Sequence, residues 1–312
     1  MHMLRGICHC LVPVIFQFGC GSLSGQKFSA VKTPQGIEVS EGDRKILFYQ
    51  SQPKSLHGQY KRAHYIHPLY SLDGTVITED FPADHPHHHG IFWAWHQVVY
   101  NGKTIADGWT SENIEWEVAK SGTRTTKDFF LLDTEVLWQS VIDNSKQTIV
   151  REFSKIVIYT AAANYRIIDF DIHLLALNDG LKIGGSEDAK GYGGFSWRLK
   201  LPDDIRFLNN DHEITPQQTA VEAGPWLDCL GSFDGSDQPQ SGVAVFCHPS
   251  NPGHPQPWIL RRQKSMQNIA FPGSVPVQLT KVGTRLRYRM VLHNANVTPQ
   301  DIERLFLAYS AK

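Results

Sequence analysis

Apolar and polar residues alternate along many stretches of this chain with the two-residue period of a β-strand. The clearest stretch is residues 165–177, where the even positions from 168 to 174 are isoleucine, phenylalanine, isoleucine and leucine, and the odd positions between them are aspartate or histidine. Strands are predicted in the same way at 28–33, 36–40, 45–50, 91–100, 113–120, 129–142, 148–160, 193–201, 243–248 and 285–293. Long strands joined by short turns predict an all-β fold, a large antiparallel sandwich.

One helix is predicted at the C-terminal end of the chain. Thr298 is a favoured N-cap residue, Pro299 suits the first helical position, and Asp301 places an acid in the first turn. Apolar residues then recur at helical spacing, at positions 302, 305, 306 and 309. We expect this helix to pack on the sandwich.

Composition narrows the function classes. The chain has 312 residues, of which 41% are hydrophobic, and its 30 Lys and Arg nearly balance its 31 Asp and Glu. Such a balance gives no basic surplus for nucleic acid. The sequence also lacks a Gly-x-Ser-x-Gly elbow, a phosphate-binding P-loop and a dinucleotide Gly-x-Gly-x-x-Gly motif. No repeat or linker divides the chain, so residues 26–312 are predicted to form a single domain.

Residues 1–25 have the order of a secretory signal. Arg5 precedes an apolar stretch at 7–18, and small residues follow it. Cys20 resembles a lipoprotein cleavage site, although Gln17 fits that pattern poorly, and a misassigned start codon is the other alternative. We therefore expect an exported protein, periplasmic or on the outer surface, with a lipid anchor at Cys20 as a variant of that expectation. No later stretch is long and apolar enough to span a bilayer.

Two cysteines, Cys229 and Cys247, lie in the body of the chain on either side of a polar turn at 234–241. A hairpin around this turn would bring the two thiols near each other. A disulfide and two buried free thiols both remain open.

The densest chemistry lies in residues 67–96, and its histidines cluster at positions 85 to 89. In an extended chain His85, His87 and His89 share one side and His88 faces the other. Three interpretations follow: proton transfer or substrate binding by neutral imidazoles, a divalent metal held by His85, His87 and His89 with Asp84, His96 or His248 as a further ligand, and a plain surface turn.

This segment also carries a resemblance to a known family. Residues 67–95 are similar to the signature of a bacterial family labelled PmoA, "methane oxygenase", which is treated as a domain of unknown function. The stretches 191–198, 224–228, 248–258 and 286–293 agree with it, so the resemblance covers most of residues 30–310. Position 89 is more often Arg in that family, and this departure favours His87 and His88 as the shared pair.

The resemblance has two implications. The label implies a metal-dependent oxygenase, yet a membrane methane-oxidising subunit needs several apolar spans that this chain lacks after its first 25 residues. The strand pattern of the family resembles a galactose-mutarotase-like supersandwich, a fold of sugar-handling proteins. That likeness is one of fold alone and does not establish a reaction.

Further candidate groups come from separate regions of the sequence. Glu187, in a Gly-rich loop, is a candidate general base, and Arg198 suits either a sugar carboxylate or phosphate or a structural ion pair. Trp226 and Asp228 suit a sugar platform and its hydrogen-bonding partner. The remaining candidates for substrate contacts are His67, Tyr70, Asp84, Trp95, Asn251 and His254.

The sequence therefore predicts an exported carbohydrate-active enzyme that performs acid/base chemistry, of lyase, epimerase or hydrolase type, on a small saccharide. His87 and His88 are its expected catalytic pair, with Glu187 as a base. The alternatives are a metal-dependent oxygenase and a non-catalytic carbohydrate-binding protein. The acid/base hypothesis requires no cofactor, whereas the oxygenase hypothesis requires a divalent metal.

Overall fold

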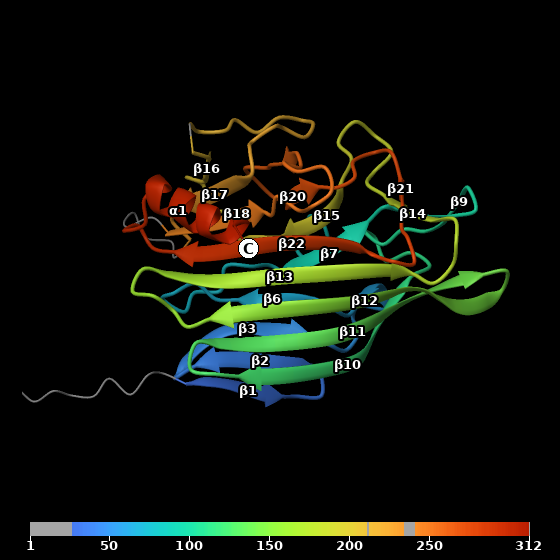
Figure 1. Cartoon of the computed structure of the whole chain (residues 1–312), viewed down its shortest axis with the longest axis horizontal. Coiled ribbons are helices and arrows are strands. Elements are labelled where there is room, and N and C mark those ends of the chain that lie inside the picture. The colour runs from blue at the N-terminus through green and yellow to red at the C-terminus, as the bar shows by residue number, and fades with distance from the viewer. Residues whose placement is uncertain (1–26, 211, 234–240, 312) are drawn as a thin grey trace, which may run out of the picture.

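The computed structural model describes residues 27–210, 212–233 and 241–311. Two eight-stranded antiparallel sheets form its framework (Figure 1). The first sheet has the strand order β1-β2-β3-β6-β7-β15-β20-β19. Its strands are β1 (Phe28–Lys32), β2 (Gly36–Glu41), β3 (Arg44–Gln50), β6 (Tyr65–Leu69), β7 (Ile91–Trp95), β15 (Gly193–Trp197), β19 (Trp258–Ile259) and β20 (Gln267–Ala270).

The second large sheet has the order β10-β11-β12-β13-β22-β18-β17-β16. Its strands are β10 (Glu115–Thr125), β11 (Phe129–Ile142), β12 (Ser145–Tyr159), β13 (Tyr165–Ala176), β16 (Arg206–Leu208), β17 (Trp226–Gly231), β18 (Ser241–Cys247) and β22 (Thr284–His293). A four-stranded sheet contains β21 (Val277–Gln278), β14 (Leu181–Gly184), β8 (Gln97–Tyr100) and β9 (Lys103–Ala106), and β4 (Lys54–Leu56) pairs with β5 (Gln59–Arg62).

An apolar core fills the space between the two large sheets because one side of each strand faces inward. In β13 the burial alternates residue by residue, as the sequence predicts. Trp95 of β7 contacts Trp138 of β11 with ring centres 5.6 Å apart, and Phe195 of β15 stacks on Tyr288 of β22 at 4.6 Å. These contacts join the two sheets, and the predicted antiparallel sandwich is confirmed.

The predicted C-terminal helix is present as α1 (Pro299–Ser310). Thr298 caps it, with its side chain accepting from the backbone N–H of Asp301 while the Asp301 carboxylate accepts from the backbone of Thr298. Phe306 of α1 packs against Phe246 of β18, so the helix covers the outer face of the second sheet. Within the described ranges, no helix is long and apolar enough to cross a membrane.

Two predictions need correction. The strand expected at 91–100 is interrupted at His96, so that β7 belongs to the first large sheet and β8 to the four-stranded sheet. The hairpin of β17 and β18 exists, but its register pairs Cys229 with Val243, and the backbone of Cys247 bonds to Pro225. Both thiols are buried and free. The predicted signal at 1–25, with Cys20, lies outside the described residues.

Candidate functional site

The histidine-rich segment is a double turn, and this corrects the extended chain assumed from the sequence. The backbone N–H of His85 donates to the carbonyl of Pro82 at 3.1 Å, and that of His88 donates to the carbonyl of His85 at 2.9 Å. Pro86 occupies the second position of the second turn, where its fixed φ favours this geometry. Gly90 follows the double turn. The position requires glycine because a Cβ there would lie 2.0 Å from the Ile66 carbonyl oxygen.

The double turn gathers three imidazoles and separates the fourth. His85 and His88 stack with ring centres 4.7 Å apart, and His87 meets His88 edge-on at 4.6 Å. His89 instead turns away and is buried, with its Nδ1 2.8 Å from Oδ1 of Asp80. The expected grouping of His85, His87 and His89 is therefore wrong, since a turn does not keep the alternation of a strand.

His85, His87 and His88 line a hollow of about 590 Å³ on the outer face of the first large sheet. An apolar floor lies on the same outer face: Phe92 and Ala94 of β7 point outward and pack with Trp109, while Trp93 and Trp95 point into the core. The other residues that line the hollow are His96, Trp109, Thr110, Ser186, Asp188, Lys190, Tyr192, Gln218, Arg261, Gln263, Lys264 and Ser265.

Two of the lining imidazoles are each paired with an aspartate. Nδ1 of His85 lies 2.7 Å from Oδ2 of Asp84, and Nδ1 of His96 lies 2.8 Å from Oδ2 of Asp107. Burial alone would raise the pKa of Asp107, but hydrogen bonds from His96 and from backbone N–H groups lower it. A carboxylate only accepts, so Nδ1 of each neutral ring carries the proton and Nε2 keeps its lone pair. Each ring is thereby prepared to act as a base.

His88 carries its ring proton on the other nitrogen. Arg198 donates from Nη1 to Nδ1 of His88 at 3.2 Å, which leaves the proton of the neutral ring on Nε2. Burial, followed by the neighbouring imidazoles and Arg198, lowers the pKa of His88, so the ring is neutral at pH 7. The Nε2–H of His88 is therefore a hydrogen-bond donor, whereas Nε2 of His85 and of His96 is an acceptor.

His87 completes the imidazole wall. Burial and then the neighbouring histidines lower its pKa to about 4, so it is neutral at pH 7. Its ring also meets Tyr60 at a centroid distance of 6.0 Å. Among the residues that the structure describes, none forms a hydrogen bond to the His87 ring, so both of its nitrogens remain available to a ligand.

The structure brings only some of the other predicted residues to this hollow. Arg198 lies behind the imidazoles and is only 2% exposed. Its Nε donates to Glu79 at 2.7 Å and its Nη2 donates to Asp84 at 2.9 Å. Arg198 therefore has the structural ion-pair role, and it positions Asp84 and His88. Glu187 is exposed and does not line the hollow, although its neighbours Ser186 and Asp188 do. The loop around Glu187 is closed by a bond from the Ser186 N–H to the Tyr192 carbonyl at 2.8 Å.

The remaining predicted residues lie elsewhere. Trp95 is a core residue whose Nε1 donates to the Phe271 carbonyl at 2.7 Å. His67 contacts the Thr78 hydroxyl at 3.0 Å, and burial lowers its pKa to about 4. Tyr70 forms a bridge to Val76 in the next turn.

Four further candidates belong to the second sheet and its loops. Trp226 is 1% exposed beneath α1, where its Nε1 donates to Glu303 at 2.6 Å, and Asp228 bonds to Nε2 of His293 at 3.0 Å. Asn251 bonds to the backbone of Arg287. His254 precedes a cis proline in the loop after β18. None of the four lines the histidine hollow.

Comparison with known proteins places the chain in a family. The profile of a family of unknown function, DUF6807, matches residues 36–307. The chain belongs to this family. The match carries no PmoA label, and a comparison with curated proteins found no match. The likeness to galactose mutarotases also remains a prediction.

The matched DUF6807 span contains residues of the hollow that sequence reasoning did not assign. Trp109, Tyr192 and Arg261 line it, and Asp107 supports His96, which the sequence offered only as a further metal ligand. Trp109 stacks on His96 at 5.3 Å and contacts Tyr192 at 5.4 Å. The signal available in the sequence was the polar pair His96 and Gln97 in the middle of the otherwise apolar run 91–100.

The site of this DUF6807 chain does not fit the divalent metal that the oxygenase reading requires. In the part of the chain that the structure describes, no three His, Cys, Asp or Glu side chains group as metal ligands. His85 and His88 present stacked faces, with 3° between their ring planes, and the Nδ1 atoms of both rings are already engaged. Stacked rings do not direct three lone pairs at one point.

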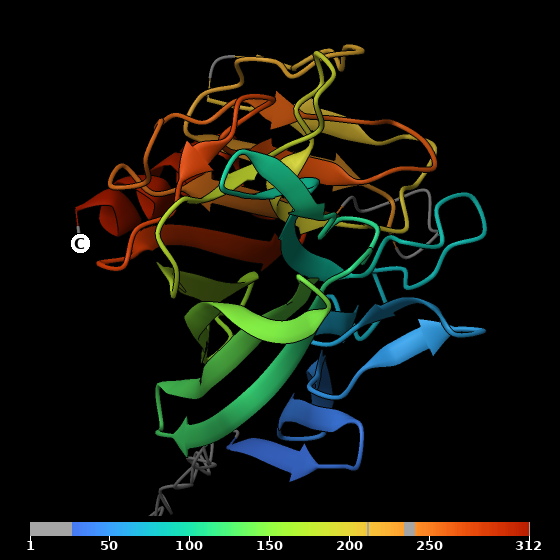
Figure 2. The same cartoon turned by 90° about the vertical axis from the view of Figure 1, so that its right-hand side faces the viewer.

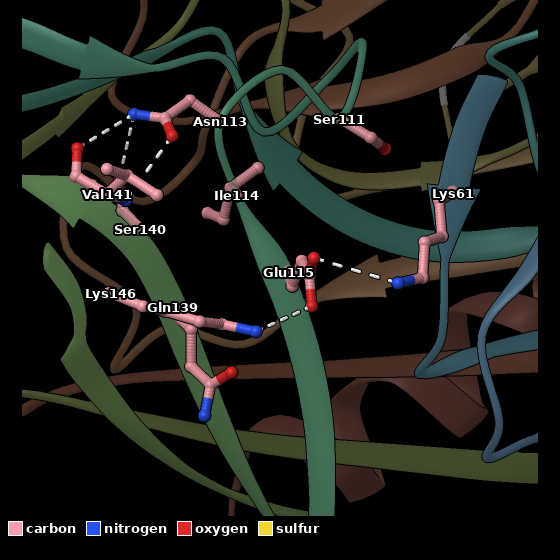
Figure 3. A pocket seen from close by; sticks show the side chains of 9 residues that line it. All are labelled: Lys61, Ser111, Asn113, Ile114, Glu115, Gln139, Ser140, Val141 and Lys146. Carbon is pink, nitrogen blue, oxygen red and sulfur yellow. Dashed lines mark hydrogen bonds and ion pairs between the residues drawn. The ribbon is translucent and has the colours of Figure 1, made fainter. Parts of the chain in front are cut away.

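A smaller hollow of about 180 Å³ lies beside β10 and β11 (Figure 3). Glu115 lies there between Lys61 at 3.6 Å and Lys146 at 2.8 Å, and the Asn113 amide donates to the Val141 carbonyl at 3.1 Å. Both of its lysines pair with its one carboxylate, and no imidazole lines it. The histidine-lined hollow is thus the stronger candidate site.

Proposed function

We propose that this protein is an enzyme that acts on a small saccharide by acid/base chemistry in the histidine-lined hollow. The observation that carries the proposal is the pair of Asp–His contacts, Asp84–His85 and Asp107–His96, on the wall of one hollow. A carboxylate that holds Nδ1–H keeps the imidazole in the tautomer whose Nε2 accepts a proton, and it stabilises the imidazolium that forms.

The imidazoles divide into two roles. His96 and His85 offer Nε2 lone pairs, so either can remove a proton from a saccharide hydroxyl or from a carbon next to a carbonyl. His88 offers an Nε2–H donor that stabilises negative charge developing on a saccharide oxygen. Proton removal on one side and stabilisation of an oxyanion on the other suit lyase, epimerase and hydrolase reactions alike.

Aromatic rings support the choice of a saccharide. Trp109 and Tyr192 line the hollow in contact with each other, and sugars present C–H faces that pack on such rings. Hydroxyl and amide groups of Ser186, Thr110 and Gln218 surround these rings. The same floor would serve a non-catalytic carbohydrate-binding protein, but such a protein has no need of two aspartate-oriented imidazoles.

The proposed test uses the folded chain with a panel of oligosaccharides in D₂O, followed by proton NMR. We expect the chain to change one class of saccharide, through a new double bond, an exchanged C–H or a released reducing end. His96→Gln is expected to remove the turnover but retain binding, whereas His173→Gln, on β13 and away from the hollow, is expected to retain both. Binding without turnover in the unmodified protein would favour the non-catalytic alternative.

We propose in addition that the protein is exported, on the basis of the signal-like order of residues 1–25. Fractionation of cells that produce the full chain would test this. Recovery of the intact chain in the cytoplasm would contradict it.

A further inference from the structure

The charges that line the hollow are unequal. Lys190, Arg261 and Lys264 contribute three cationic groups, whereas Asp188 contributes the one carboxylate. Asp188 is itself 3.6 Å from Lys190. The side chains that line the hollow therefore carry more positive than negative charge, and His87 adds none because its pKa is lowered to about 4. The carboxylates of Asp84 and Asp107 contact His85 and His96 and do not themselves line the hollow. A cavity with such an excess favours an anionic ligand.

Arg261 is the most constrained of the three cations. Its Nη1 donates to the carbonyls of Gln217 and Leu260 at 2.7 and 2.8 Å, and its Nη2 donates to the carbonyl of Gln218 at 2.9 Å. The buried side chain of Gln267 also bonds to both the N–H and the carbonyl of Arg261. The guanidinium is consequently held in place before any ligand arrives, which reduces the entropy lost on binding.

Within the described residues, two N–H donors of Arg261 have no hydrogen-bond partner. A guanidinium has five, of which backbone carbonyls take three, so Nε–H and one N–H of Nη2 are left, on the two nitrogens that form one edge of the group. The same edge of Arg289 holds the carboxylate of Asp169 in this protein, at 2.6 and 2.7 Å. Among the described residues, no Asp or Glu pairs with Arg261. Its fork is therefore open to a carboxylate from outside the chain.

A series of contacts through Tyr192 and Trp109, the aromatic floor of the hollow, links Arg261 to His96. The guanidinium carbon is 5.5 Å from the centre of the Tyr192 ring, Tyr192 contacts Trp109, and Trp109 stacks on His96. A saccharide lying along these two rings would meet the cation at one end and the Asp-oriented imidazole at the other.

We propose that the hollow binds an anionic saccharide, a uronic acid, with its carboxylate on the Nε and Nη2 edge of Arg261. The inference rests on the proposed function of the hollow and narrows its substrate class. Lys190 and Lys264 add attraction without fixed geometry, because a lysine ammonium is a point charge on a flexible stem.

Isothermal titration of the full chain with uronic acid disaccharides and their methyl esters tests the proposal, because the ester keeps the shape and loses the charge. We expect the acid to bind about tenfold more tightly than its ester, since a charge-assisted bidentate contact is lost. Arg261→Gln should weaken binding of the acid about tenfold and leave that of the ester unchanged. Arg262→Gln is the matched control, because Arg262 pairs with Glu213 at 3.5 Å and does not line the hollow.

Equal affinity of the unmodified protein for acid and ester would overturn the proposal without any variant. An equal loss in Arg261→Gln and Arg262→Gln would overturn it too. Binding of neutral disaccharides in preference to uronates would reject the anionic substrate while supporting a saccharide site. If no saccharide of either charge binds, the proposed function itself fails.

Discussion

His96 donates from Nδ1 to Oδ2 of Asp107 across 2.8 Å, at the point where the chain leaves one sheet for another. Since β7 and β8 belong to different sheets, the backbone at His96 is free of ladder pairing while both neighbouring strands remain fixed. The imidazole is thereby held on a rigid support beside the hollow. A catalytic group on such a support loses little order when it acts.

Asp107→Asn is expected to reverse the proton position on His96. An Asn side chain can present its NH₂ group to Nδ1, so the ring would shift its proton to Nε2 and lose its basic lone pair. We expect a loss of about 100-fold or more in turnover, the order of magnitude of general-base catalysis. Nitrogen-15 NMR of the histidine rings checks the tautomer without any substrate. Asp188→Asn is the control, and an unchanged His96 spectrum in Asp107→Asn would contradict the assignment.

Stability is expected to fall as the pH drops from about 6.5 to about 5. His67 and His87 have pKa values lowered to about 4, whereas an unfolded histidine titrates near 6.5. In this window the unfolded chain binds protons that the folded chain does not, so the free energy of unfolding decreases with decreasing pH. The raised pKa of His293 acts in the other direction and only above about pH 6.5.

Urea unfolding at several pH values measures this effect. The double variant His67→Gln/His87→Gln should show a smaller pH dependence between 6.5 and 5, because two of the responsible groups are gone. A double variant whose pH dependence equals that of the unmodified protein would show that these two rings are not the source.

Glu152→Ala is expected to destabilise the fold by about 3–5 kcal/mol. Glu152 is fully buried between the sheets and accepts hydrogen bonds from His64 at 2.7 Å, from Trp93 at 2.9 Å and from Trp138 at 2.8 Å. Removal of the carboxylate would leave these buried donors without an acceptor. The free energy of unfolding in urea gives the comparison.

The surface supplies the control for this measurement. Glu115 pairs with Lys61 and Lys146 in the smaller hollow (Figure 3), but its side chain is 48% exposed. Glu115→Ala should therefore cost less than about 1 kcal/mol, as exposed ion pairs do. Similar losses in the two variants would mean that the buried network contributes nothing beyond a surface pair.

Trp226→Ala is expected to act on stability and not on saccharide binding. Trp226 lies under α1 in contact with Phe246, so its removal leaves a cavity that costs about 3–5 kcal/mol. Tyr192→Ala, at the half-buried aromatic floor of the hollow, should instead weaken saccharide binding with a smaller loss of stability. A Trp226→Ala protein with unchanged stability and lost binding would restore Trp226 as the sugar platform.

The parts of the fold that sequence could predict are those in which local pattern and burial agree. In β13 every second side chain faces the core, and Thr298 with Asp301 forms the cap that begins α1. The histidine segment was harder to predict because proline permits both an extended chain and a turn. The contact between His88 and Arg198, which are 110 residues apart, is compatible with the turn and leaves no local trace in the sequence.

The candidate site was predictable in its imidazoles and not in its surroundings. His87 and His88 were expected at a pocket, and the structure places both there. Trp95 and Trp226 were expected at substrate, but a tryptophan is equally suited to a core, and both are buried. The sequence of β7 does not show which of its two faces points outward, because every residue of that strand is buried. Only the second sheet decides this.

The helix and the hollow occupy opposite outer faces of the sandwich: α1 covers the second sheet, and the histidine double turn lies over the first (Figure 2). The last described residues follow directly from α1. A surface, bead or fusion partner joined directly after α1 would therefore meet the helical side and leave the mouth of the hollow open to ligand. The protein can in this way be immobilised for ligand screening with the histidine-lined hollow still accessible.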